Sequence, residues 1–348
     1  MFAEKLLNWY SENGRRLPWR DTDNPYYIWL SEIILQQTRI EQGRSYYEHF
    51  VTHYPSVDAL AKATEEQVLK SWQGLGYYSR ARNLHAAAKY IADELDGVFP
   101  NTYDGILKLK GVGRYTAAAI ASFAFKLPYP VIDGNVYRLV SRLYGIYTPI
   151  GTDQAYREFE ALLLNLIDQE HPDLFNQAIM DFGSIYCKPV GCDCGNCIFR
   201  QECVAFNQGK VGLLPVKPQK VKVVERYFYY IDVVWPGARL MHQRESGDIW
   251  QGLYELPLHE CENALDPGEL VGRILDVLNE WFGETPQELT VGPELKHQLT
   301  HRTIKAQFLQ AKYAQKPERI PSKMKVVTAK VQKSLPISRL IDRYLMKL

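Results

Sequence analysis

Four closely spaced cysteines are the residues of this chain best suited to hold a reactive or structural centre. Cys187, Cys194, Cys197 and Cys203 follow the pattern C-x6-C-x2-C-x5-C. Four thiolates supplied by one short segment are what a 4Fe-4S cluster requires. Two disulfides or a tetrathiolate zinc site are the alternatives, although zinc sites usually use two C-x-x-C pairs and this stretch has one. The spacing therefore favours one iron-sulfur cluster, with Cys192 as a substitute ligand or a bystander.

The composition indicates a folded protein in a reducing compartment. A length of 348 residues suggests about two domains. The chain is 46% apolar and 23% charged, and its uninterrupted apolar runs are too short for a membrane span. It begins on a helical pattern rather than a cleavable signal, so we expect a cytoplasmic protein with no membrane partner. In that compartment clustered cysteines are more often metal ligands than disulfides. A net charge of +1 provides no global basic field.

The apolar pattern predicts a multidomain chain. A helical period runs over residues 2–206, whereas the composition at 209–222 is that of an extended linker rich in Pro and Lys. Beyond it, segments rich in β-branched and aromatic residues predict strands at 227–235, 237–243 and 303–313, with helices at 268–282 and 337–348. We therefore expect an all-α domain at 1–208, a linker at 209–225 and an α+β domain at 226–348.

A turn with two glycines predicts a helix-hairpin-helix. Gly111-Val112-Gly113-Arg114 joins a helix near 103–109 to an alanine-rich helix at 115–125. Glycines permit positive φ and expose backbone N–H groups, and the next helix N-terminus attracts a phosphate. A helix C-cap followed by an ordinary turn is the alternative.

Asp133 stands where a carboxylate could do chemistry. An extended segment at 130–132 runs into Asp133-Gly134-Asn135, and a helix is predicted from Val136. Asp133 is thus expected to cap that helix. The helix N-terminus should also lower the pKa of its carboxyl group, which would keep Asp133 ionised beside a developing positive charge.

The hairpin, Asp133 and the four-cysteine segment, in this order, resemble the helix-hairpin-helix DNA glycosylases that carry an iron-sulfur cluster. The resemblance covers residues 1–216 and implies one of two classes. The bifunctional endonuclease III type has a lysine nucleophile directly after the hairpin arginine, whereas this chain has Tyr115. The segment 29–38 resembles the active-site helix of the adenine glycosylases of the MutY type, which implies that Glu32 is the general acid. Burial would raise the pKa of Glu32 and keep it protonated, although a solvent-facing glutamate is the alternative.

The same resemblance implies roles for other residues. Tyr115 and Asn135 would position Asp133 and the attacking water. Gly111, Val112, Gly113, Arg114 and Arg80 would contact DNA, Gln37 and Tyr77 would wedge into the duplex, and Trp19, Arg20 and Gln177 would line the base pocket. Tyr77 and Trp19 are otherwise ordinary core aromatics.

The C-terminal part resembles the Nudix-like module of the MutY type. Trp250 to Pro257 is similar to the Nudix opening strand, but 271–283 lacks the paired glutamates that hold Mg²⁺, so pyrophosphate hydrolysis is not expected. Leu299-Thr300-His301 occupies the place of a Phe-Ser-His motif that contacts the oxidised base. The hydroxyl and the imidazole are kept, while the apolar contact differs.

The resemblance implies an enzyme that excises adenine opposite 8-oxoguanine, or guanine, in double-stranded DNA without cutting the strand, and we assume that it is a monomer. A bifunctional glycosylase of pyrimidine lesions is the alternative enzyme. A nucleic-acid-binding iron-sulfur protein without glycosylase chemistry is the alternative outside catalysis.

Overall fold

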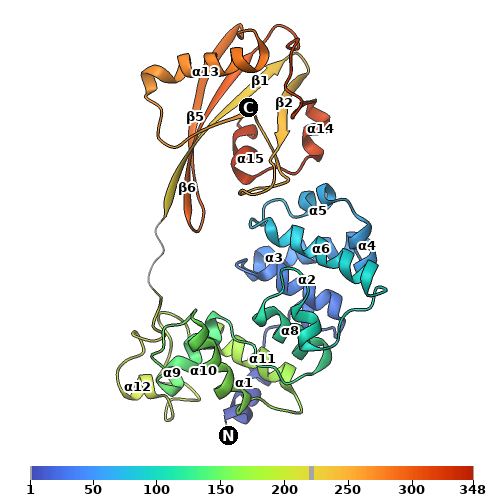
Figure 1. Ribbon diagram of the computed structural model, residues 1–348. Helices are drawn as coiled ribbons and strands as arrows, with labels where there is room; N and C mark the ends of the chain where they lie inside the picture. Colours follow the sequence, from blue (N-terminus) through green and yellow to red (C-terminus); the bar gives the residue numbers. More distant parts are fainter. Residues whose placement is uncertain (1, 219–222, 348) are drawn as a thin grey trace. The chain divides into compact units, whose positions relative to one another are not determined.

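The computed structural model describes residues 2–218 and 223–347 (Figure 1). Of the expected linker at 209–225, residues 219–222 lie outside the described residues. The chain divides into two compact units, Met1–Lys62 with Ala86–Gln219 and Ala63–His85 with Lys220–Leu348. Within the described residues, no helix combines the length and the apolar character needed to cross a membrane.

The first unit is helical, and its described residues contain no strand, as the periodicity predicts. Helix α9 shows why, since Val136, Leu139, Val140 and Leu143 recur at helical spacing and are buried in one apolar core. This unit contains α1 (Phe2–Asn13), α2 (Pro25–Leu35), α3 (Ile40–His53), α4 (Val57–Lys62), α7 (Tyr103–Leu107), α8 (Arg114–Phe125), α9 (Gly134–Tyr144), α10 (Asp153–Leu164), α11 (Pro172–Asp181) and α12 (Val204–Asn207). Helix α5 (Glu65–Ser71) belongs to the second unit, and α6 (Ser79–Glu94) crosses the boundary.

The second unit is built on a mixed sheet in the order β3-β2-β1-β6-β5, with β4 paired to β1 and β7 to β2. Strands β1 and β6 are parallel, and the other pairs are antiparallel. The strands are β1 (Val224–Trp235), β2 (Ala238–Gln243), β3 (Tyr254–Glu255), β4 (Leu258–Cys261), β5 (Glu288–Gln298), β6 (Arg302–Lys312) and β7 (Met324–Val327). The helices that accompany them are α13 (Pro267–Phe282), α14 (Ala329–Ser334) and α15 (Arg339–Leu345).

Successive side chains of β1 are buried on opposite faces of the sheet, which explains why helices lie on both faces (Figure 1). Phe228 and Tyr230 pack into one apolar core with residues of α15. Tyr229 and Ile231 point to the opposite face and pack with residues of α13. Successive side chains of a strand point to opposite faces, so a strand whose central residues are buried on both faces requires a cover on each side. The α+β prediction for this part is confirmed.

Candidate active site and cysteine loop

A cavity of about 230 Å³ in the helical unit collects the residues predicted to act on the base. Its walls come from the single helical turn Pro18–Arg20 and from the ends or faces of α2, α8, α9 and α11. The predicted residues that line it are Trp19, Arg20, Glu32, Tyr115, Asp133, Asn135 and Gln177. The fold thus brings seven residues, spread over more than half of the helical sequence, around one space.

Glu32 is a buried carboxyl group on the cavity wall, with 8% of its surface exposed. It lies on α2, whose residues are buried on nearly every side, so the alternative of a solvent-facing glutamate does not hold. Burial raises the pKa of Glu32 to about 7, against a hydrogen bond with Tyr115 and the charge of Arg20, while the charge of Asp133 acts in the same direction as burial. A carboxyl group with such a pKa is protonated in a large fraction of molecules at neutral pH.

Asp133 is the N-cap of α9, as predicted, and it also lines the cavity. Its Oδ1 accepts the backbone N–H groups of Asn135 at 2.8 Å and Val136 at 2.7 Å, and its Oδ2 accepts the Asn135 amide at 2.7 Å. Arg138 fixes that amide by donating to Asn135 Oδ1 at 2.8 Å. The expected lowering of the pKa is wrong in sign, because desolvation raises the pKa of Asp133 more than the hydrogen bonds from Val136 and Asn135 lower it.

Asp181 was missed by the sequence analysis, although it holds one side of the cavity. It is fully buried, and its carboxylate accepts hydrogen bonds from Arg20 at 2.8 and 2.9 Å and from Arg15 Nε at 2.9 Å. Burial alone would raise the pKa of Asp181, but the hydrogen bonds from Arg20 and Arg15 outweigh it and hold the pKa below its usual value. An aspartate inside the apolar run 178–182 is the signal that could have identified it. Gln177 is fixed separately, because Tyr10 donates to its Oε1 at 2.7 Å.

The predicted hairpin forms between α7 and α8. Gly111 has φ +82°, which favours glycine, whereas Gly113 has φ −97° and is the N-cap of α8. A Cβ on Gly113 would meet no heavy atom within 4 Å, so its backbone faces open space. Val112 is buried beneath the turn. Arg114 donates to Asp153 at 3.0 Å at the surface.

The two predicted wedge residues share an unusual backbone. Gln37, in the turn after α2, has φ +54°, and Tyr77 has φ +47°. Both side chains are exposed. Non-glycine residues held at positive φ often mark functional sites, because the surrounding structure must compensate the strain. In the second unit, Arg80 is 9% exposed, and its guanidinium lies over the rings of Trp72 and Tyr77 at 5.1 and 5.6 Å.

Five cysteines line a second cavity of the helical unit, and the five are Cys187, Cys192, Cys194, Cys197 and Cys203. All five are free thiols, so the disulfide alternative is not realised. Arg142 of α9 is 3% exposed and supports the loop, donating to Lys188 O at 2.7 Å and lying 3.4 Å from Cys187 Sγ. Among the described residues, no three His, Cys, Asp or Glu side chains surround a common point as ligands of a single metal ion.

In the second unit, the segment predicted to recognise the oxidised base forms the tip of the β5–β6 hairpin. Leu299, Thr300 and His301 connect the strands and border a cavity of about 700 Å³. The hydroxyl groups of Tyr77 and Thr300, which both belong to this unit, are 2.7 Å apart. Trp250, another residue with positive φ, lines the same cavity.

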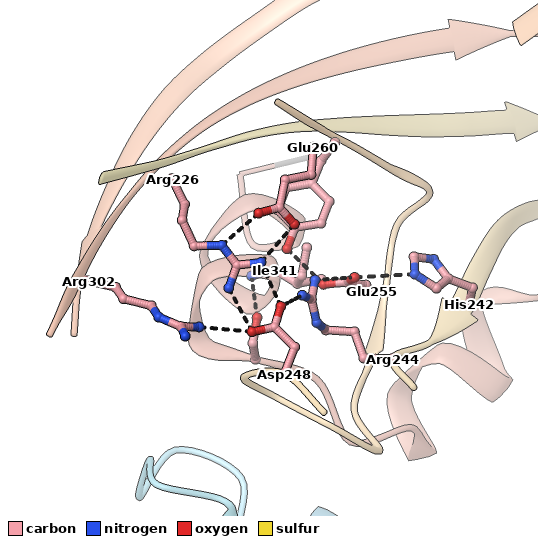
Figure 2. Close-up of polar contacts among 10 residues, drawn as sticks. Arg226, His242, Arg244, Asp248, Glu255, Glu260, Arg302 and Ile341 are labelled. Atoms are coloured by element: carbon pink, nitrogen blue, oxygen red, sulfur yellow. Dashed lines mark hydrogen bonds and ion pairs between the residues drawn. The ribbon is translucent and has the colours of Figure 1, made fainter. Parts of the chain in front are cut away.

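An ion-pair network includes Arg302, the first residue after the tip of this hairpin (Figure 2). Asp248 is its centre: Arg226 donates to both carboxylate oxygens at 2.7 and 2.6 Å, and Arg302 donates to Oδ1 at 2.9 Å. Arg244 joins Asp248 to Glu255, whose Oε1 accepts from Arg244 at 2.8 Å. The sequence analysis did not identify this network. Because Arg302 directly follows His301, Asp248 ties the hairpin tip to the loop that contains Trp250.

Comparison with known proteins agrees with this architecture. The family model described as "HhH-GPD superfamily base excision DNA repair protein" matches residues 30–165, and the NUDIX domain model matches residues 230–347. The adenine DNA glycosylase of Buchnera aphidicola (subsp. Baizongia pistaciae) is 32% identical over 313 residues, which cover 87% of this chain and 84% of that protein. The mouse adenine DNA glycosylase is 37% identical, covering 62% of this chain and 44% of that one. A solved thermostable thymine-DNA glycosylase shares 27% identity over 60% of this chain and 95% of its own, with a TM-score of 0.56.

The fold and the matched models define a base excision repair protein with an endonuclease III-like helical domain and a Nudix-like domain. The chain belongs to the adenine DNA glycosylase family. It is accordingly a DNA glycosylase of base excision repair.

Proposed function

We propose that this protein is a monomeric, monofunctional glycosylase that removes adenine paired with 8-oxoguanine, or with guanine, in double-stranded DNA. The arrangement of two carboxyl groups on one cavity carries this proposal. Burial raises the pKa of Glu32 to about 7, so a large fraction of this group is protonated at neutral pH, whereas three hydrogen bonds to the Asp133 carboxylate stabilise its ionised form against the burial that raises its pKa. Two carboxyl groups in such different surroundings divide into an acid and an anion.

Glu32 is proposed to protonate the purine ring of a flipped adenine. Protonation turns the base into a neutral leaving group, as the general acid does in glycoside hydrolysis. Trp19, Arg20 and Gln177 would hold the base in the cavity, and the cost of flipping is a few kcal/mol in this kind of reaction. Arg20 has a second role, because its pairing with Asp181 fixes the cavity wall beside the base.

Asp133 is proposed to stabilise the oxocarbenium-like sugar, or to trap it covalently, before water attacks. The three donors on its oxygens fix the orientation of the carboxylate, so no reorganisation is required as positive charge develops. Asn135 would orient both Asp133 and the water. Tyr115, hydrogen-bonded to Glu32, would hold the acid in place.

Base release without strand cleavage follows from the residue at position 115. A lyase requires an amine that can attack the sugar and form a Schiff base, and Tyr115 offers a phenol. Lys126 also borders the cavity, but its ammonium pairs with Asp173 at 2.6 Å. Borohydride trapping tests this point directly, because only a Schiff-base intermediate becomes covalently linked to DNA.

DNA is proposed to meet the helical unit at the hairpin and at the strained turn after α2. The open space above Gly113 and the N-terminus of α8 suit a phosphate oxygen, with Gly111, Val112 and Arg114 shaping the turn. Gln37 would insert into the duplex at this turn, and Tyr77, which belongs to the second unit, is proposed separately as an inserting residue. Arg80 would act through Tyr77, because its guanidinium packs on that ring.

The cysteine loop is proposed to hold one 4Fe-4S cluster through Cys187, Cys194, Cys197 and Cys203. The donor set fits, since free thiols line one cavity with a buried guanidinium beside them. Hydrolysis of a glycosidic bond is not a redox reaction, so the proposed role of the cluster is to stabilise the structure of the loop. Thr300 and His301, at the hairpin tip, would hydrogen-bond the oxidised partner of the adenine, with Leu299 as the apolar contact.

Single-turnover release of adenine tests the proposal. Duplexes with adenine opposite 8-oxoguanine, guanine and thymine are compared under excess enzyme, and the fastest release is expected opposite 8-oxoguanine. Replacing Asp133 by Asn should leave duplex binding nearly unchanged and remove base release. Failure to release adenine from every duplex would overturn the proposed activity.

A further inference from the structure

The cysteine loop contains one thiol more than a cluster with four cysteine ligands requires. Cys192 lines the same cavity as the four predicted ligands. Its neighbours Gly191 and Asp193 are exposed, whereas Cys192 and Cys194 are partly buried, so alternate residues of this segment face inward. We propose that Cys192 is a second ligand for the cluster position of Cys194 and can replace it. This inference rests on the proposed iron-sulfur cluster.

The distance between the two sulfurs identifies the shared position. Cys192 Sγ and Cys194 Sγ are 3.5 Å apart. Two sulfurs bound tetrahedrally to one metal at about 2.3 Å lie roughly 3.8 Å apart. Each iron of a 4Fe-4S cluster takes one cysteine and completes its coordination with inorganic sulfide. Two thiols at this separation therefore compete for one iron and do not serve two.

The guanidinium of Arg142 lies near the sulfur of Cys192 as well as near the sulfur of the predicted ligand Cys187. Its Nη1 lies 3.4 Å from Cys187 Sγ and 3.7 Å from Cys192 Sγ, so one buried guanidinium contacts a predicted ligand and the additional thiol together. Hydrogen bonds to ligand sulfurs are a regular feature of iron-sulfur centres. Arg142 is itself fixed by Leu214 O at 3.1 Å and Pro189 O at 3.2 Å.

The backbone conformation allows Cys192 to replace Cys194 with a change confined to a few residues. Cys194 N–H donates to Cys192 O at 3.1 Å, which closes a tight turn between the two residues. Using Cys192 changes the ligand spacing from C-x6-C-x2-C to C-x4-C-x4-C and leaves Cys187, Cys197 and Cys203 unchanged. The two sulfurs are already neighbours, so the exchange requires a shift of the segment 192–194 alone.

Iron and acid-labile sulfide, measured per chain in the purified full-length protein, test the exchange. C194S should keep most of the iron of the wild type, whereas the matched control C197S and the double variant C192S/C194S should lose most of it. If C194S loses as much iron as C197S, or if the double variant keeps as much as C194S, the exchange is wrong. A wild-type protein without iron and sulfide would instead overturn the proposed cluster itself.

Alkylation mapped by mass spectrometry provides a readout that does not depend on cluster yield. In the loaded wild type, Cys192 should react with the alkylating agent and Cys194 should be protected. In loaded C194S, Cys192 should become protected, and its continued reaction would overturn the proposal. Should C194S fail to fold, C192S supplies the test: it should lose iron several-fold faster than the wild type under mild oxidation, and equal rates would overturn the exchange.

Discussion

Glu32 in the helical unit and Asp248 in the second unit are carboxyl groups whose pKa values are shifted in opposite directions. Glu32 is almost fully buried, and burial raises its pKa to about 7 despite Tyr115 and Arg20. Burial also acts to raise the pKa of Asp248, but hydrogen bonds from Arg226 and other donors overcome it and hold the pKa well below the usual range. The cationic partners that contact the carboxylate therefore decide between the two outcomes. A carboxyl group with few cationic contacts can exchange a proton, whereas one enclosed by guanidinium groups can only hold structure.

The same contrast exists inside the helical unit. Asp181 is fully buried, yet its contacts with Arg15 and Arg20 keep its pKa below the usual value. Arg20 contacts the carboxylate of Asp181 directly, while it acts on Glu32 only through its charge. One arginine thus serves an ionised structural acid and leaves a neighbouring acid free to titrate.

Replacing Glu32 by Gln is the largest change that the comparison predicts. A general acid contributes about 10²- to 10⁴-fold to a rate, so the single-turnover rate of adenine release should fall by that factor while duplex binding is kept. In the wild type the acid must be protonated, so the rate should decline as the pH rises through about 7. Glu12→Gln, at an exposed position, is the control. A Glu32→Gln enzyme with the wild-type rate would remove Glu32 from the acid role.

The same substitution should stabilise the protein at alkaline pH. Because the pKa of Glu32 is about 7 in the folded state and 4.5 in its ordinary state, the folded protein binds the proton more tightly, and stability falls as the pH rises through this interval. At pH about 8, Glu32→Gln should therefore increase the free energy of unfolding by up to about 3 kcal/mol. At pH about 4 the gain should vanish. Urea unfolding at both values measures the difference, and a gain that is equal at both would contradict the raised pKa.

Replacing Asp248 by Asn should change stability in the opposite direction. The variant leaves Arg226, Arg244 and Arg302 without their common anion. The loss for a buried pair is about 3–5 kcal/mol, and partial exposure of Asp248 reduces it to about 2 kcal/mol. Since the pKa is lowered, this stability is present at neutral pH and is lost as the pH falls below the usual range of an aspartate.

Calorimetry of the full-length chain measures the Asp248→Asn effect. Glu225→Gln is the matched control, because Glu225 pairs with Lys305 at the exposed surface of the same sheet, and it should have no measurable effect. An equal effect of the two substitutions would mean that the network of Figure 2 behaves as ordinary surface charge.

The sequence predicted local features of the site better than its electrostatics. The capping position of Asp133 and the turn at Gly111 depend on neighbours in the chain, and both are confirmed. The fold class is also confirmed, because the spacing of apolar residues along the chain indicates which face of each helix or strand is buried. The pKa of Asp133 was predicted with the wrong sign, because desolvation depends on distant walls of the cavity. Asp181 was missed because Arg15 and Arg20 lie far away in the sequence, and Asp248 was missed because Arg226 and Arg302, two of its three arginine partners, do so as well.

Replacing Thr300 should have the smallest effect, and it tests whether recognition of the oxidised base is separate from the acid step at Glu32. Its hydroxyl lies 2.7 Å from that of Tyr77, and a single neutral hydrogen bond contributes about 0.5–1.5 kcal/mol. If the Thr300 hydroxyl serves recognition of the oxidised base, Thr300→Val should lower the preference for 8-oxoguanine over guanine about two- to tenfold. The chemical step at Glu32 should keep its pH dependence, because the substitution does not alter the acid.

The control for Thr300→Val lies in the same hairpin. Thr303 is buried, and its hydroxyl donates to Gln298 at 2.9 Å, so Thr303→Val removes a hydrogen bond of similar strength from the strands next to the tip. That variant should lose stability and keep its preference for 8-oxoguanine. Equal loss of preference in both variants would mean that hairpin stability, and not the Thr300 hydroxyl, determines recognition. A change in the pH dependence would instead show that the second unit influences the acid, and the division between a titrating site and a structural network would no longer hold.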